Sequence, residues 1–316
     1  MIGKVLSLGA VAMDFVLECD LLPRDDGFEV IRKEKLLPGG SASNISVTLA
    51  ALGVEVYQAG QIGDDKCGIA FRKSLREDGV NDSWLVTKKG GTTLHTYIIA
   101  ASQGQHCIFA NLGDCVGTMD PALFPEKLVA GMDCLYVDMF SAEAALRLAA
   151  QAKEASVPIL YNMQCPPSFM RESGTSRKDI ESMLSSCSLF ISGKDGYFEM
   201  TGEKDSMVAM KQIWEQYQIP EGVIYTAGEK GSFWWEGKKM YHQEAFQIES
   251  VDTTGAGDCF TGGLIYSYIV SGFEKQRSLE FASAAAAIKC MQKGPRSKAD
   301  AAQINGFLAD HKKNYA

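Results

Sequence analysis

Short apolar runs recur along the chain at intervals that suit buried strands. Five of these runs are rich in β-branched or other apolar residues, and amphipathic stretches fill most of the gaps between the later ones. This alternation predicts parallel strands joined by crossover helices, which is the pattern of a doubly wound α/β fold with a mostly parallel sheet flanked by helices. The predicted strands are residues 5–8, 134–137, 158–161, 188–191 and 223–225.

Four helices are predicted from apolar residues at helical spacing. Ser141 is expected to cap the first helix, whose apolar stripe extends from Ala144 to Ala152. A second helix is expected to follow Asn44 and to stop at Gly53, since glycine commonly ends helices. The third and fourth are predicted over residues 256–271 and 278–291.

Two stretches do not fit the strand and helix alternation. Residues 15–19 with 30–36, and residues 93–101 with 106–111 around a turn at Gln103-Gly104, are typical of hairpin strands outside any βαβ unit. They predict a small sheet set apart from the main body. We therefore interpret residues 1–316 as a single α/β domain whose segments 15–37 and 92–112 form a β-stranded lid.

The charge balance argues against extended anionic partners. The chain of 316 residues has 31 Lys and Arg against 39 Asp and Glu, a formal net charge of −8, so we expect no nucleic acid and no membrane surface as partners. Residues 5–13 could imitate a secretory signal, but a first buried strand is the favoured interpretation. Nine scattered cysteines without a C-x-x-C pair indicate reduced, mostly buried thiols, and we expect a cytoplasmic protein.

A glycine pair precedes the helix that is predicted after Asn44. Gly39 and Gly40 would let the backbone approach a ligand closely, and the Asn44 amide offers both a donor and an acceptor to a polyhydroxylated molecule. Taken alone, the segment also fits a simple turn with Asn44 as a helix cap. This simpler interpretation is favoured when no other part of the chain is considered.

Another glycine-rich segment leads into the predicted helix 256–271. Gly255, Ala256 and Gly257 would expose backbone N–H groups at a helix N-terminus, where an anion such as phosphate is favoured. Asp258 follows at once, so its carboxylate could accept a proton from an attacking hydroxyl. The alternative is that Asp258 only supplies acidic charge to a first helical turn. The glycines, this carboxylate and Asp252 upstream together favour a function.

The segment after the predicted strand 223–225 is a third candidate. Thr226, Gly228 and Gly231 place a hydroxyl and flexible backbone at the carboxyl edge of a sheet, where open α/β folds bind ligands. A hairpin turn into residues 232–235 is equally compatible. The sequence contains no P-loop, no dinucleotide fingerprint, no zinc spacing and no G-x-S-x-G motif.

Taken together, these segments resemble the ribokinase-like family of sugar kinases, also called the phosphofructokinase B type, from about residue 3 to residue 298. The resemblance implies the doubly wound body and lid, with transfer of the ATP γ-phosphoryl group to a hydroxyl of a sugar or nucleoside. It also implies Mg²⁺ and a possible homodimer through the lid. It rests on Asp14, Gly39 to Asn44, Ile62 to Asp65 with Gly68, Thr226 to Gly231, and Asp252 to Asp258.

The resemblance also implies roles for single residues. Asp258 would be the general base, and the backbone of Gly255, Ala256 and Gly257 the anion hole. The sugar would be held by Asp14, Gly39, Gly40, Asn44 and Asp252, and in some relatives the Asp252 loop also binds a monovalent cation such as K⁺. Thr226, Gly228 and Gly231 would line the nucleotide site, with the region 287–294 near the adenine.

Two positions depart from the family pattern. The expected N-x-x-E segment, which organises Mg²⁺, has Gly193 and Gly196 in place of its two polar side chains, with Lys194 and Asp195 between them. Ser41 stands where a lysine is typical, which favours an uncharged acceptor. We expect an ATP-dependent carbohydrate kinase. The alternatives are a nucleoside kinase of the same fold, or a sugar- or nucleotide-binding protein with impaired catalysis.

Overall fold

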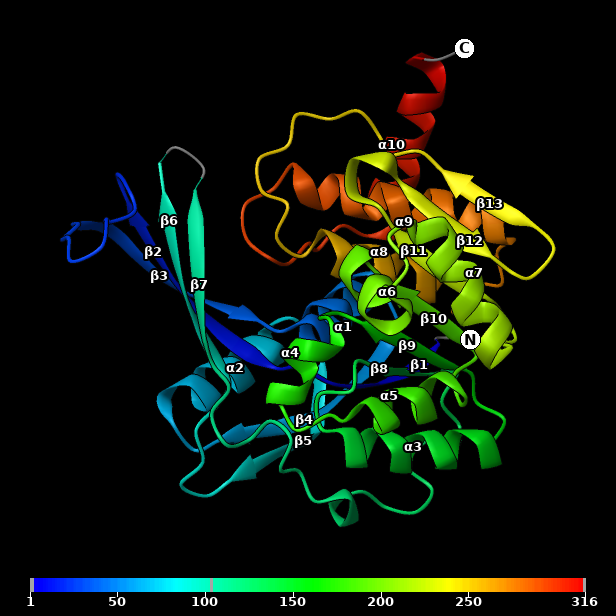
Figure 1. Cartoon of the computed structure of the whole chain (residues 1–316), viewed down its shortest axis with the longest axis horizontal. Coiled ribbons are helices and arrows are strands. Elements are labelled where there is room, and N and C mark those ends of the chain that lie inside the picture. The colour runs from blue at the N-terminus through cyan, green and yellow to red at the C-terminus, as the bar shows by residue number, and fades with distance from the viewer. Residues whose placement is uncertain (1–2, 103–104, 315–316) are drawn as a thin grey trace.

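The computed structural model of the chain describes residues 3–102 and 105–314. Helices cover both faces of a nine-stranded sheet, and a second sheet extends from one side of it (Figure 1). The strand order of the large sheet is β13-β12-β11-β10-β9-β8-β1-β4-β5, and β11 through β5 are parallel, whereas β12 and β13 are antiparallel. Its strands are β1 (Lys4–Leu8), β4 (Glu55–Gly63), β5 (Asn81–Lys88), β8 (Cys134–Val137), β9 (Ile159–Met163), β10 (Leu189–Ser192), β11 (Val223–Thr226), β12 (Ser232–Trp235) and β13 (Met240–Gln243).

The predicted mostly parallel sheet is confirmed, and the five predicted strands correspond to β1, β8, β9, β10 and β11. Strand β4 was not predicted because polar side chains interrupt its apolar pattern. Gln58 in this strand is fully buried, where its Oε1 accepts a 2.7 Å hydrogen bond from Ser46 and its Nε2 donates to the Ser7 carbonyl at 3.2 Å. A buried amide with both ends satisfied is compatible with a core strand but does not show in a hydropathy pattern.

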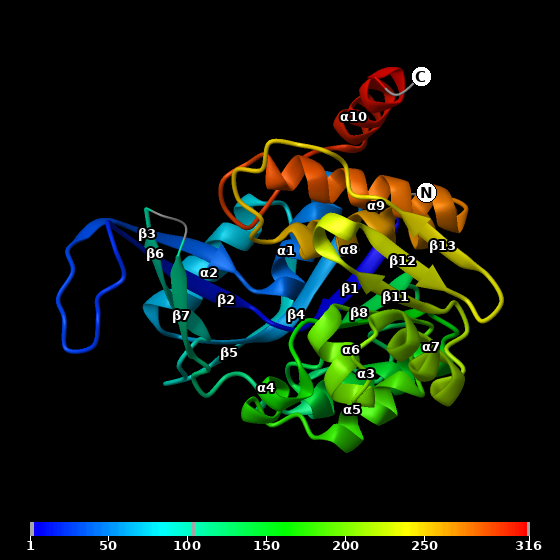
Figure 2. The same ribbon diagram turned by 45° about the horizontal axis from the view of Figure 1, so that its top comes forward.

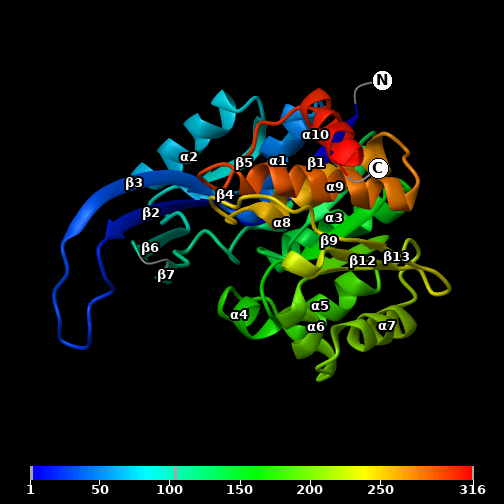
Figure 3. The ribbon, with the colours of Figure 1, turned by 90° about the horizontal axis from the view of Figure 1, so that it is seen from above.

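Alternating side chains of the strands pack against helices on opposite faces. Leu6 and Leu8 of β1 belong to one apolar cluster, and Val5 belongs to the other. The two layers of helices are seen on either side of the sheet in Figure 3. One layer is α1 (Ser41–Ala51), α2 (Lys66–Glu77), α8 (Ala256–Leu264) and α9 (Lys275–Cys290), with α10 (Ala301–Asn314) against α9, and the other is α3 (Ala142–Glu154), α4 (Pro167–Glu172), α5 (Arg177–Leu184), α6 (Lys194–Thr201) and α7 (Ser206–Tyr217).

The four predicted helices exist, but some of their ends differ from the prediction. Ser141 is the N-cap residue of α3, as predicted, but its φ is 75° and its side chain makes no capping hydrogen bond. Helix α1 begins at Ser41, so Asn44 lies inside its first turn. Helix α8 continues as one π-helical segment, Ile265–Val270, before Gly272. Helix α9 begins three residues before the predicted start.

The second sheet has the strand order β3-β2-β6-β7. Its two hairpin pairs are antiparallel, and they join through the parallel pairing of β2 with β6. Figure 2 shows this sheet projecting from the body together with the connection between β2 and β3. The predicted turn at Gln103-Gly104 lies outside the described residues. The strands are β2 (Ala12–Cys19), β3 (Ile31–Gly39), β6 (His95–Ala101) and β7 (His106–Asn111).

Two further observations concern thiols and membranes. The nine cysteines are all free, and six of them are buried, as predicted from their scattered apolar surroundings. Within residues 3–102 and 105–314, no helix combines the length and the apolar character that crossing a bilayer requires.

Candidate functional site

The first turns of α1 and α8 meet at one point, and this contact defines the candidate site. Asn44 Nδ2 donates a 2.8 Å hydrogen bond to Asp258 Oδ2, across a separation of 214 residues in the sequence. Both side chains are buried, with 4% and 7% of their surface exposed. Two residues that were predicted from separate motifs therefore form one polar pair.

Close packing of α1 on α8 brings this pair together. Gly262 of α8 faces Thr48 of α1, and a Cβ atom at position 262 would lie 2.8 Å from the Thr48 side chain. Thr48 also donates its hydroxyl to the Cys259 sulfur at 3.4 Å. Only glycine at position 262 permits this backbone approach without displacing a neighbour.

Arg296 is a further member of the site that sequence reasoning missed. Its Nε donates to Asn44 Oδ1 at 3.2 Å, and its Nη2 donates to Ser43 Oγ at 3.1 Å. Its Nη1 forms a 2.7 Å ion pair with Asp78 at the end of α2. Because Asn44 Oδ1 accepts from Arg296, the amide nitrogen is left to face Asp258. No local motif signals this role, since the contact between residues 296 and 44 spans 252 residues.

The surroundings of Asp258 favour its protonated form more than water does. Burial raises the pKa of its carboxyl group from the ordinary 3.8 to about 6, although hydrogen bonds from Asn44 and Ser41 and the charge of Arg296 act in the opposite direction. A carboxylate with such a pKa is ionised at neutral pH and is still basic enough to accept a proton. Ser41, noted above only as a departure, is thus one of the groups that lower the pKa of Asp258.

The glycine-rich turn before Asp258 forms the N-terminus of α8. Gly255 is its N-cap with a φ of 78°, and a Cβ atom there would lie 1.9 Å from the Pro295 carbonyl oxygen. The Ala256 N–H donates to the Thr253 carbonyl at 3.1 Å. A Cβ atom at Gly257 would meet no other atom within 4 Å, so the space beside this residue is open. An anion could therefore approach the helix end at Gly257.

The predicted sugar-binding residues of the first segments lie beside the same pair. Asp14 of β2 accepts a 2.6 Å hydrogen bond from the Thr96 hydroxyl of β6. Burial raises the pKa of the Asp14 carboxyl group, with the Thr96 hydrogen bond opposing this shift. A Cβ atom at Gly39 would lie 2.1 Å from Asp14 Oδ2, so glycine leaves room for the carboxylate. Gly40 is the N-cap residue of α1.

Asp252 is placed differently from the other predicted sugar ligands. Its Oδ1 accepts from the Thr254 N–H at 2.9 Å, and its Oδ2 accepts from the Gly294 N–H at 2.8 Å. Burial opposes ionisation of this group, but hydrogen bonds from Thr254 and Gly294, together with the charge of Lys289, outweigh it and lower the pKa of Asp252. Oδ1 therefore stabilises the turn within the loop before α8, and Oδ2 holds this loop to the segment after α9.

The predicted nucleotide-binding residues form a tight turn between β11 and β12. Thr226 pairs with Ser232 in the antiparallel ladder, and the Ala227 N–H donates to the Gly231 carbonyl at 2.8 Å. Gly228 begins the short 3-10 helix η2 (Gly228–Lys230). The hairpin that the sequence left open is therefore present, and Thr226 lies at the carboxyl end of its strand.

The segment where the family pattern expects N-x-x-E opens α6. Gly193 is the N-cap with open space around its absent side chain, whereas a Cβ atom at Gly196 would lie 2.1 Å from Ser192 Oγ. In the part of the chain that the structure describes, no three His, Cys, Asp or Glu residues gather in a way that could hold a metal. The segment that opens α6 therefore does not provide a preorganised set of protein ligands for Mg²⁺.

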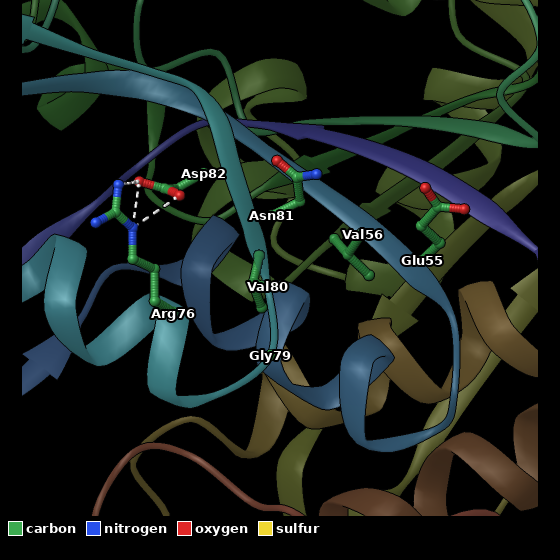
Figure 4. Close-up of a pocket in the computed structure, with 7 residues that line it drawn as sticks. All are labelled: Glu55, Val56, Arg76, Gly79, Val80, Asn81 and Asp82. Carbon is green, nitrogen blue, oxygen red and sulfur yellow. Dashed lines mark hydrogen bonds and ion pairs between the residues drawn. The ribbon is translucent and has the colours of Figure 1, made fainter.

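A surface hollow elsewhere does not belong to this site. It measures about 510 Å³ and lies where β4 and β5 begin, with Arg76 bound to Asp82 on one side (Figure 4). Ligands of open α/β sheets bind outside the carboxyl ends of the strands, and this hollow is at the amino ends. Its lining residues are Glu55, Val56, Arg76, Gly79, Val80, Asn81 and Asp82.

Comparison with known proteins decides the family. The model of the pfkB family of carbohydrate kinases matches residues 3–302. The chain belongs to this family. The chain is therefore a carbohydrate kinase, a phosphotransferase with an alcohol group as acceptor, and the resemblance seen in the motifs is confirmed.

Individual relatives of this pfkB protein agree with that assignment. An ATP-dependent ribose-1-phosphate kinase from Halopiger xanaduensis is 27% identical over 313 residues, which cover 97% of this chain and 98% of the relative. A putative ribokinase from Agrobacterium tumefaciens superposes with a TM-score of 0.86 at 22% identity, over 99% and 98% of the two chains. The Methanocaldococcus jannaschii nucleoside kinase gives a TM-score of 0.80 at 17% identity, over 98% and 99%. These solved structures confirm the fold.

Proposed function

We propose that this pfkB kinase transfers the γ-phosphoryl group of ATP to a hydroxyl of a sugar or related polyol, with Asp258 as the general base. The observation that carries this proposal is the buried Asp258 carboxylate, oriented by Asn44 beside the open helix end at Gly257. The acceptor hydroxyl gives its proton to Asp258 while its oxygen attacks the γ-phosphorus, and the bond to the β-phosphate oxygen breaks. The backbone of Gly255, Ala256 and Gly257 is proposed to serve as the anion hole, where the Ala256 N–H would exchange its hydrogen bond to the Thr253 carbonyl for one to the phosphoryl group.

The acceptor is proposed to lie between the second sheet and α1. Asp14, Gly39, Gly40 and Asn44 line this side, and their carboxylate, amide and backbone groups suit the hydroxyls of a polyol. An uncharged acceptor is favoured because Ser41 offers no cation and because Arg296 is already paired with Asp78. Asp252 is proposed to contribute by shaping the loop that carries the anion hole.

ATP is proposed to bind near the β11–β12 turn, with Thr226, Gly228 and Gly231 beside it. Mg²⁺ is proposed to enter with the ATP phosphates, since it keeps several waters and is often held largely by substrate oxygens. Asp195 and Lys194 stand at the start of α6, where the family pattern expects the metal-organising pair. Phosphoryl transfer depends mainly on positioning and charge neutralisation, which the residues described above supply.

The decisive experiment is ADP release on a panel of acceptors. Ribose, fructose, ribose 1-phosphate, adenosine and inosine are compared for the wild type and Asp258→Asn. We expect turnover of one uncharged sugar and its loss in the variant. Equal turnover in the two proteins would remove Asp258 from the role of base. Calorimetric binding of ATP and sugar without ADP release would instead favour a binding protein with impaired catalysis.

A nucleoside acceptor is the second candidate, and one observation favours it. Phe15 of β2 and Tyr97 of β6 stack with ring centroids 5.0 Å apart, and Tyr97 is 40% exposed on the second sheet. An exposed ring beside the proposed acceptor region could stack on a nucleobase. Competition by adenosine or inosine against the best sugar distinguishes the two acceptor classes.

The second sheet is proposed to act as a lid and as a dimer interface. It carries several exposed apolar side chains, and a large apolar patch commonly marks an interaction surface. We expect Phe109→Glu to convert a dimer into a monomer in light scattering, and a monomeric wild type would contradict this proposal. The exposed apolar residues are Ile31, Leu36, Tyr97, Ile108 and Phe109.

A further inference from the structure

Lys289 has an unusual environment for a lysine. It lies in the last turn of α9, and none of its surface is exposed. Its Nζ donates to two main-chain carbonyl oxygens, that of Asp252 at 2.8 Å and that of Gln292 at 3.3 Å. Lysine is rarely buried to this extent because removing an ammonium group from water is costly. The two carbonyl oxygens offset part of this cost for Lys289.

The ammonium group lies at the joint between two segments that frame the candidate site. The N–H groups of Val251 and Asp252 both donate to the Cys290 carbonyl, at 2.7 and 3.1 Å. The Gly294 N–H donates to the Asp252 carboxylate from the same segment. Lys289 adds a fixed positive charge to this joint, next to the Asp252 carboxylate. Three residues beyond Asp252, the chain reaches the glycine-rich end of α8.

The resemblance to sugar kinases implies that the same loop binds a monovalent cation in some relatives. A dehydrated K⁺ is held by carbonyl oxygens that replace its hydration shell, and a buried ammonium group uses the same oxygens as hydrogen-bond acceptors. In this chain the Asp252 and Gln292 carbonyl oxygens already accept hydrogen bonds from the Lys289 ammonium group, which is a cation that belongs to the chain itself. The residues therefore do not fit the expectation of an exchangeable ion at this joint.

We propose that the Lys289 ammonium group is a built-in cation that holds the 252–257 loop in its phosphate-binding shape, so that the protein needs no added monovalent cation. Lys289 is a positioning residue, because it touches the loop and not the reacting atoms. The inference rests on the proposed phosphate-binding role of that loop. The kinase activity alone does not imply that the protein is independent of added monovalent cations.

The test compares cations and removes the ammonium group. ATP affinity by calorimetry and thermal unfolding are measured in KCl and in tetramethylammonium chloride, whose large cation cannot enter a carbonyl site. For the wild type we expect the same ATP affinity within twofold and the same melting temperature in both salts. For Lys289→Ala in tetramethylammonium we expect at least tenfold weaker ATP binding and a lower melting temperature. Methylammonium or K⁺ should restore both quantities, because either cation can occupy the vacated space.

Two controls keep the test decisive. Lys289→Met fills the space without a charge, so it should lose ATP affinity without rescue, and it replaces Lys289→Ala if that variant fails to fold. Lys275→Ala removes another largely buried lysine, at the far end of α9, and should leave the response to cations unchanged. Tenfold tighter ATP binding by the wild type in K⁺, or unchanged binding by Lys289→Ala, would overturn the proposal. Melting temperatures are measured without acceptor or nucleotide. They therefore test the role of Lys289 even if the proposed kinase reaction is wrong.

Discussion

Asn44 donates its amide nitrogen to Asp258 at 2.8 Å, and the other end of the same amide accepts from Arg296. The amide orientation is therefore determined from both sides. A carboxylate that receives an N–H from a fixed amide keeps one oxygen in place and leaves the other for a second partner. This arrangement suits a base that must meet an acceptor hydroxyl in one defined geometry.

Replacing the proposed base should abolish most of the activity. We expect Asp258→Asn to lower kcat by about 10²–10⁴-fold, because general base catalysis usually contributes this much. ADP release in a coupled assay measures the loss. Calorimetry should show that ATP binding is retained, since the anion hole consists of backbone groups.

The same variant should be more stable than the wild type at neutral pH. The folded-state pKa of Asp258, about 6, lies above the ordinary 3.8, so the folded protein binds more protons between these values. Stability from this group is therefore fully present below about pH 4 and is lost as the pH rises through about 6. We expect Asp258→Asn to gain up to about 3 kcal/mol at pH 8 and little at pH 4. Urea unfolding at both pH values checks this, and a variant less stable at pH 8 would contradict it.

Arg296 should control both the geometry and the pKa of the base. Arg296→Gln removes a charge that lowers the pKa of Asp258, so the acid limb of the kcat/KM profile should move to higher pH. Arg296→Lys keeps the charge but loses the planar fork, so we expect about a 10–100-fold fall in kcat/KM with little shift of that limb. Lys298→Ala, which removes the exposed second partner of Asp78, is the control and should change neither. A purely structural Arg296 would leave the limb unmoved in both variants.

The close approach of α1 and α8 should tolerate no added methyl group. Gly262→Ala places a Cβ atom against Thr48, so we expect a loss of about 1–3 kcal/mol in unfolding free energy and a lower kcat. The matched control is Gly306→Ala in α10, where a Cβ atom meets nothing within 4 Å and should stabilise the helix by about 0.5–1 kcal/mol. Thermal unfolding compares the two variants. Equal unfolding free energies for the two variants would contradict this prediction, because they would show that α1 and α8 can move apart without loss of stability.

Restoring the missing polar side chains should change the need for Mg²⁺. Gly193 has open space, so Gly193→Asn should fold normally. A Cβ atom at position 196 would lie 2.1 Å from Ser192 Oγ and 2.9 Å from Met163 Sδ, so Gly196→Glu requires Ser192→Ala beside it and a shift of the flexible Met163 side chain. We expect the combined variant to reach half-maximal ADP release at about tenfold lower Mg²⁺, the usual effect of residues that orient metal ligands and their waters. Gly193→Asn alone serves as the reference. An unchanged Mg²⁺ requirement would mean that the metal is held without this segment.

The sequence predicts the parts of this molecule whose signal is local. The buried strands β8 and β11 and the glycine-rich end of α8 show as apolar runs or turn residues, and they are present where expected. Strand β4 escapes prediction because the buried Gln58 depends on Ser46 and Ser7 for its hydrogen bonds. Arg296 escapes because its partners at residues 43, 44 and 78 are far away in the sequence. A contact between residues that are far apart in the sequence does not change the hydropathy pattern around either residue, so that pattern cannot reveal it.

The long sequence separations within the site have a consequence for biosynthesis. Asp258 finds Asn44 across 214 residues, and Arg296 finds Asn44 across 252 residues. Contacts of such separation can form only after almost the whole chain has left the ribosome. A nascent chain or a fragment truncated before residue 296 lacks the Arg296 contact that orients Asn44 toward Asp258, the proposed base, so we expect incomplete copies of this kinase to consume no ATP.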